Sequence, residues 1–177
     1  KYIIYEHDYK FVAARNPIAY KNWIVPPLQK INLNFYANAQ KTICLSNMQR
    51  GIFEKNLSLQ NIENFQCSMW SDEQLKNIEN CMDVAKNNKF AVIRSDNPTK
   101  LTTKAVEYCI KAKIDFDLIE SNNYKEFIKI LSRYRGLVFM TRHPEPTPRV
   151  AIEAKMLNMK FIAQKNMISV AHEDYYH

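Results

Sequence analysis

From residue 89 onward, short β-type runs alternate with amphipathic helical stretches, and this alternation restricts the fold more than any other feature. The β-type runs are KFAVIRS (89–95), DFDLIE (115–120), GLVFMT (136–141) and MKFIAQ (159–164). Apolar residues recur at helical spacing between them, and Asp96 is the expected N-cap of the first helix. Strands that alternate with helices predict βαβ units with right-handed crossovers. We therefore expect an α/β lobe with a Rossmann-like parallel sheet and flanking helices.

The part of the chain before residue 89 shows the same alternation less regularly. Its predicted strands cover residues 2–8, 41–46 and 62–68, and its predicted helices cover residues 26–39, 47–57 and 71–88. In the last of these helices, Ser71 is the expected N-cap, and Asp72 and Glu73 suit the positive end of the helix. We expect two lobes, residues 1–68 and 69–177. Because the chain begins abruptly on the strand-like run KYIIY, we expect the first lobe to be incomplete.

The composition excludes several kinds of site. The chain contains only two glycines, which rules out a Walker A loop and a GxGxxG fingerprint. Its four cysteines form no CxxC pair, so the spacing predicts neither zinc nor a disulfide framework, and reduced thiols in the cytoplasm are the expectation. The net charge of +7 suits phosphate ligands, nucleic acid or an anionic membrane, but no run of cations selects among them.

The segment HPEPTPRVAIEAKML (143–157) carries the first candidate site. It opens with prolines that suit a loop and a first helical turn, and continues as a helix. Amides near Thr147, Arg149 and Val150 would form an anion site together with the helix dipole. Glu145 precedes the helix and Glu153 lies within it, so both carboxylates can accept hydroxyl groups beside that site. The alternative is that Glu145 belongs to a surface loop and Glu153 only stabilises the helix start.

Further candidates follow other predicted strands, where ligands of open α/β sheets bind. Arg94 ends the first strand of the second lobe and Lys100 opens the next helix, so the pair could neutralise two phosphates. Ser121 and Asn122 follow the second strand of that lobe, and His7 follows the first strand of the chain. The alternative is an ordinary surface pair for Arg94 and Lys100, and a solvated or structural His7.

Two spacings carry a resemblance to a known family. Glu145-x7-Glu153 between a strand and an EAKML helix, together with Arg94-x5-Lys100, resembles the retaining GT-B glycosyltransferases of family 4. The resemblance implies that Glu153 holds the ribose, and that Glu145 approaches the donor hexose. It implies that Arg94 and Lys100 grip the diphosphate. By the same resemblance, His7 lies near the donor sugar, amides of residues 147–150 meet the diphosphate and sugar, and Ser121 and Asn122 line the base pocket. The chain departs from the family in carrying Pro-Thr-Pro where glycines are usual.

The resemblance implies a GT-B-type C-terminal lobe that binds a nucleotide-sugar, with the N-terminal lobe on the acceptor side. The expected activity is metal-independent transfer of a hexose from a nucleoside-diphosphate sugar, as donor substrate, to a glycan, lipid or protein. No cofactor and no nucleic-acid partner are expected, and peripheral association with a membrane is left open. One alternative is a non-catalytic nucleotide- or carbohydrate-binding module derived from such an enzyme. A basic nucleic-acid-binding protein is the other, and it would bind with steep salt dependence.

Overall fold

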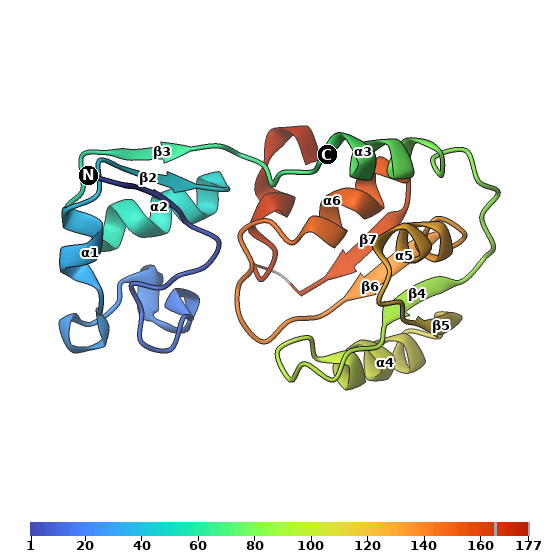
Figure 1. The fold of residues 1–177 in the computed structure, drawn as a ribbon. Helices are drawn as coiled ribbons and strands as arrows, with labels where there is room; N and C mark the ends of the chain where they lie inside the picture. Colours follow the sequence, from blue (N-terminus) through green and yellow to red (C-terminus); the bar gives the residue numbers. More distant parts are fainter. Residues whose placement is uncertain (165, 177) are drawn as a thin grey trace. The chain divides into compact units, whose positions relative to one another are not determined.

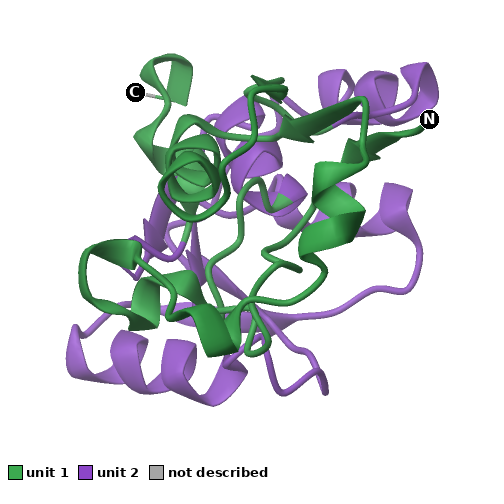
Figure 2. Cartoon of the chain, turned by 90° about the vertical axis from the view of Figure 1, so that its left-hand side faces the viewer, with its two compact units in different colours: residues 1–68, 143–148, 168–177 green, residues 69–142, 149–167 purple. Residues whose placement is uncertain are grey.

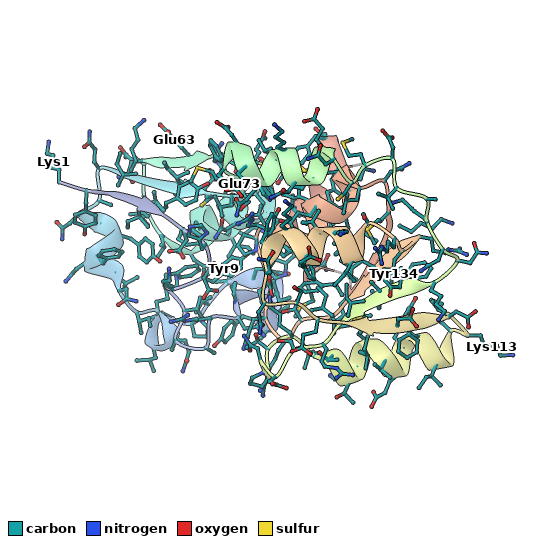
Figure 3. All side chains as sticks on the ribbon, turned by 45° about the vertical axis from the view of Figure 1, so that its right-hand side comes forward. Lys1, Tyr9, Glu63, Glu73, Lys113 and Tyr134 are labelled. Carbon is teal, nitrogen blue, oxygen red and sulfur yellow. The ribbon has the colours of Figure 1, made fainter. Side chains whose placement is uncertain are left out.

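The computed structural model describes residues 1–164 and 166–176, which form two compact units (Figure 2). Unit 1 comprises residues 1–68, 143–148 and 168–177, and unit 2 comprises residues 69–142 and 149–167. The first change of unit follows Ser68, where the sequence predicted a boundary. Residues 143–148 and the C-terminal stretch, both assigned to the second lobe from sequence, group instead with unit 1.

Unit 2 contains a parallel four-stranded sheet in the order β5-β4-β6-β7. The strands are β4 (Phe90–Ile93), β5 (Phe116–Ile119), β6 (Gly136–Phe139) and β7 (Lys160–Ala163). They are connected by α4 (Thr102–Lys111), α5 (Tyr124–Leu131) and α6 (Arg149–Met156), and α3 (Asp72–Glu79) precedes them. In Figure 1, α4 lies on one face of the sheet and α3, α5 and α6 lie on the other. The predicted α/β class with Rossmann-like parallel sheets is confirmed.

Gly136, at the start of β6, is required by close packing between strands. A Cβ atom there would overlap the ring of Phe90 and lie 2.8 Å from the carbonyl oxygen of Lys160. Phe90 and Lys160 are the register partners of Gly136 on the two neighbouring strands. Only a residue without a side chain therefore fits between them.

Unit 1 contains a parallel three-stranded sheet in the order β1-β2-β3. Its strands are β1 (Ile3–Tyr5), β2 (Lys41–Cys44) and β3 (Ile62–Asn64), and its α-helices are α1 (Leu33–Ala37) and α2 (Asn47–Asn56). Short 3-10 turns complete it: η1 (Pro17–Ala19), η2 (Lys21–Trp23), η3 (Pro27–Gln29), η4 (Ser169–His172) and η5 (Asp174–Tyr176). The core is aromatic: the ring centroids of Phe11 and Tyr36 lie 4.7 and 5.5 Å from that of Phe53.

Two predicted helix starts had different outcomes. Ser71 caps α3 as predicted, and Gln74 completes a capping box by accepting a hydrogen bond from the Ser71 amide. The N-cap assigned to Asp96 is wrong, because α4 begins six residues later at Thr102. Asn97 instead forms a turn that includes Pro98: its side chain accepts from the Thr99 amide, and its carbonyl accepts from Lys100.

Two predicted helices were too long. The helix expected over residues 26–39 is replaced by η3 and the five-residue α1, because Pro26 and Pro27 lack amide donors and Asn32 adopts a left-handed conformation. The helix expected over residues 71–88 ends at Glu79. None of the helices in residues 1–164 and 166–176 has the length and apolarity needed to cross a membrane.

Candidate functional site

The loops that follow β4 and β6 meet in unit 2. The sheet order places β4 and β6 side by side, while the chain leaves β4 toward β5 and leaves β6 toward β7. This reversal is a topological switch point, the place where open α/β sheets bind ligands. The amide of Arg142 donates to the carbonyl of Thr99 at 2.8 Å, and the Thr141 hydroxyl donates to the same carbonyl at 3.3 Å. These bonds join the loop that carries Arg94 and Lys100 to the start of the segment that carries Glu145.

Arg94 and Lys100 lie at the two ends of the loop after β4. The Arg94 side chain is exposed, and its amide extends the β4 ladder by donating to Ile119 at 2.9 Å. Lys100 is half-buried, and its ammonium lies 5.1 Å from the ring centroid of Phe139 at the end of β6. Thr102 bridges the two ends of this loop. Its hydroxyl donates a hydrogen bond to the Ile93 carbonyl at 2.9 Å and accepts one from the Ser95 amide at 3.2 Å.

A surface depression of about 400 Å³ lies beside this loop, at the start of α4. It is lined by Ser95, Asp96, Asn97, Pro98, Leu101, Thr102, Thr103, Lys104 and Glu107. Neither Arg94 nor Lys100 is part of its lining. The depression therefore lies next to Arg94 and Lys100, the pair predicted to bind phosphate, without containing either residue.

Glu153 is the centre of a buried polar cluster in unit 2. Only 3% of its surface is exposed, and its Oε1 atom accepts hydrogen bonds from the Trp70 indole and the Tyr124 hydroxyl, both at 2.9 Å. The Nε atom of Arg149, one turn earlier on α6, lies 3.6 Å from the same oxygen. The cluster thus satisfies the buried carboxylate with two neutral donors and one cation.

Arg149 contacts the two aromatic members of this cluster through its planar group. Its guanidinium carbon lies 5.3 Å from the Trp70 ring and 5.2 Å from the Tyr124 ring, a cation–π geometry on both sides. Burial, followed by the charge of Glu153, raises the pKa of Tyr124 to about 12. Tyr124 is therefore a neutral hydrogen-bond donor at physiological pH.

Sequence reasoning missed Trp70 and Tyr124. Both have a local signal: Trp70 directly precedes the N-cap of α3, and Tyr124 is the first residue of α5, just after Ser121 and Asn122. Ser121 is half-buried, and its hydroxyl accepts from the Asn123 amide at 3.1 Å, whereas Asn122 is exposed. The positions that we assigned to a base pocket thus lead directly into the residue that contacts Glu153.

Three of the remaining predicted site residues, Glu145, Thr147 and His7, belong to unit 1. Glu145 pairs with Ile168 in an isolated parallel bridge, and its carbonyl accepts from the Ser169 amide at 3.0 Å. Thr147 is 8% exposed, and its hydroxyl oxygen has no hydrogen-bond partner among the described residues. His7 is exposed, with its ring 4.9 Å from that of Tyr5. Arg149 and Val150 form the first turn of α6 in unit 2.

Within each unit, only some of the predicted residues are brought together. Arg149 and Glu153 are in contact, and the loop of Arg94 and Lys100 is bonded to the residues that follow β6. Across the described residues, no group of three or more His, Cys, Asp or Glu side chains is arranged to hold a metal ion.

The chain was compared with protein-family models, with curated proteins and with solved structures. None of the three comparisons produced a match.

Proposed function

We propose that the chain is a nucleotide-sugar-dependent glycosyltransferase of the GT-B type. It would act in the cytoplasm and transfer a hexose from a nucleoside-diphosphate sugar to a glycan, lipid or protein, with retention of configuration. The observation that carries the proposal is the pair of hydrogen bonds to the Thr99 carbonyl at the switch point of unit 2. They join the loop with the Arg94-x5-Lys100 spacing to the segment that leads into Glu145-x7-Glu153.

The proposed chemistry in unit 2 is stabilisation of a departing nucleoside diphosphate. In a front-face mechanism, the glycosidic bond to the diphosphate breaks while positive charge develops on the sugar and negative charge on the leaving phosphate. The acceptor oxygen then bonds to the anomeric carbon on the same face, and its proton passes to the departing phosphate oxygen. A guanidinium and an ammonium at the two ends of one loop can neutralise that negative charge. The amides of Arg149 and Val150 lie in the first turn of α6, where backbone donors and the helix dipole favour an anion.

The proposed ribose contact must be made by a carboxylate that is almost fully buried. An ionised carboxylate can accept roughly four hydrogen bonds, so the two donors on Glu153 Oε1 leave room for ribose hydroxyls. Because Glu153 is 3% exposed, a ribose can reach it only if part of the surrounding cluster moves. Arg149, whose side chain is 37% exposed, would have to leave its contacts with Trp70 and Tyr124 to turn toward a phosphate. The roles proposed for His7, Glu145 and Thr147 in unit 1 rest on the resemblance alone.

Calorimetry with nucleoside diphosphates and the matching nucleosides tests the phosphate role. Arg94→Ala combined with Lys100→Ala should weaken diphosphate binding about 10- to 100-fold while changing nucleoside binding little. Lys111→Ala combined with Lys129→Ala removes the same charge from exposed helical positions and should leave both affinities nearly unchanged. Equal losses for diphosphate and nucleoside would contradict the proposal.

Donor turnover separates an enzyme from a binding module. The proposed enzyme should hydrolyse or transfer the sugar of the donor that it binds, and the Arg94→Ala, Lys100→Ala double variant should lose that turnover. Tight binding of nucleoside diphosphate with no turnover, tested with a panel of acceptors, would favour the non-catalytic alternative.

A further inference from the structure

A cluster of large apolar side chains is exposed on one short segment of unit 1. Within residues 21–35, which we call the apolar segment, Leu28 is 95% exposed and Ile24 is 55% exposed. Ile31, Leu33 and Phe35 follow at 41%, 45% and 50%. Figure 1 shows this stretch in blue, running through η2, η3 and α1. Single exposed apolar residues are normal, whereas five within twelve consecutive positions concentrate exposed apolar surface on one short segment.

The apolar segment is held in place by its backbone and by its inward-facing residues. Val25 and Tyr36, at or next to the segment, are each 1% exposed and belong to the core of unit 1. The Asn56 side chain accepts from the Val25 amide and donates to the Trp23 carbonyl, both at 2.7 Å. The exposed apolar side chains therefore project from an ordered backbone, because Val25, Tyr36 and Asn56 anchor that backbone to the core of unit 1.

The apolar segment itself carries only positive charge, because residues 21–35 contain Lys21 and Lys30 and no acidic residue. Between Tyr9 and Phe53 the sequence contains six basic residues and no acidic residue. Lys21 at the start of the segment is exposed, and Lys10 and Arg15 lie on the preceding stretch, paired with Glu6 and Asp8. Trp23, half-buried under the ammonium of Lys55, adds an amphipathic aromatic side chain. Exposed apolar side chains among cations and aromatics are the chemistry of interfacial membrane binding.

We infer that the apolar segment docks unit 1 on an anionic lipid bilayer. Leu28, at the tip of the Pro-Pro-Leu turn, inserts together with Ile24 into the boundary between headgroups and acyl chains, while Lys21 meets lipid phosphates. Lys21 and Lys30, with no acidic residue in the segment, accompany the exposed Ile24 and Leu28, and an anionic bilayer complements both because it offers phosphates above an apolar interior. The inference does not depend on the proposed glycosyltransferase activity.

Cosedimentation of the full chain with lipid vesicles tests the inference. The chain should bind vesicles of equal parts phosphatidylglycerol and phosphatidylcholine, bind pure phosphatidylcholine much less, and dissociate at high salt. Ile24→Asp combined with Leu28→Asp should weaken binding about tenfold or more, since buried apolar area is replaced by anions. Lys21→Gln should weaken it about fivefold, the effect of one lost cation near the surface.

The matched control is Ile110→Asp, which changes a side chain with 67% exposure on α4 of unit 2. It should bind vesicles as the unchanged chain does, and circular dichroism should show that all the variants remain folded. Absence of binding to anionic vesicles, or an equal loss in Ile110→Asp, would overturn the inference. So would sedimentation velocity that shows a dimer abolished by Ile24→Asp and Leu28→Asp in a chain that ignores vesicles, since the segment would then bind a second copy.

Discussion

Units 1 and 2 both contain a parallel sheet, but they differ in how the chain connects the strands. In unit 2 each connection between strands contains one α-helix of eight to ten residues. In unit 1 the connection from β1 to β2 is built from three 3-10 turns and the five-residue α1. Pro17, Pro26 and Pro27 occupy this connection, and Asn22 and Asn32 adopt left-handed conformations within it.

The difference shows what a regular helix contributes to an α/β unit. An amphipathic helix buries one whole face against its sheet, whereas an irregular connection buries single residues and leaves others outside. This explains why exposed apolar side chains accumulate in residues 21–35, while the polar candidate site of unit 2 lies at regular strand ends. The two units therefore offer different surfaces: unit 2 a polar switch point and unit 1 an apolar face.

The largest contrast is expected between the two glycines, one in each unit. Gly136→Ala should lower the free energy of unfolding by about 1–3 kcal/mol, because a Cβ atom would overlap the Phe90 ring between closely packed strands. Gly51→Ala in α2 should raise it by roughly 0.5–1 kcal/mol, since no atom lies within 4 Å of the new methyl group. Urea denaturation of both variants measures the contrast, and a Gly136→Ala variant as stable as the unchanged chain would contradict the strand packing.

A second prediction concerns the side chain that secures the irregular connection of unit 1. Asn56→Ala removes the acceptor of the Val25 amide and the donor to the Trp23 and Ile52 carbonyls. It should lower the free energy of unfolding by about 2 kcal/mol, the effect of leaving buried backbone groups unpaired. Asn38→Ala, which removes one exposed hydrogen bond to Asn34, is the matched control and should change stability by under about 0.5 kcal/mol. Equal effects in urea denaturation would show that Asn56 does not hold the connection.

The smallest effect is a pH dependence that belongs to unit 1. Burial raises the pKa of Glu6, although the Tyr36 hydroxyl, Lys10 and the Asp8 amide favour its charged form. Between the ordinary carboxyl range and that raised pKa, the folded chain holds a proton that the unfolded chain has lost. Stability should therefore fall as pH rises through this window and become level above it. Urea midpoints measured between about pH 4 and pH 7 should show this component in the unchanged chain and lose it in Glu6→Gln. An identical pH profile in the variant would contradict the assignment.

Sequence-based prediction was correct for regular strands and helices and wrong where the backbone is irregular. The strands and helices of unit 2 were predicted because hydrophobic periodicity is a local property, and Ser71 was predicted as a cap because its hydroxyl binds an amide three residues away. The helix over residues 26–39 and the cap at Asp96 failed because proline, left-handed residues and a local turn override the periodic pattern. The sequence correctly predicted that Arg94 and Lys100 follow a strand and that Glu153 lies on a helix. It did not predict the role of Trp70, because Trp70 lies outside any periodic hydrophobic pattern.

The sequence by itself determined the α/β class, the parallel strands of unit 2 and the candidate residues that follow them, because spacing and turn chemistry act over a few residues. The tertiary structure alone decided three other matters. It set the strand order β5-β4-β6-β7, and it grouped residues 143–148 and 168–177 with unit 1. It also brought the Trp70 indole to Glu153, 83 positions away. These depend on which distant surfaces pack together, since a buried carboxylate requires donors wherever the fold can supply them.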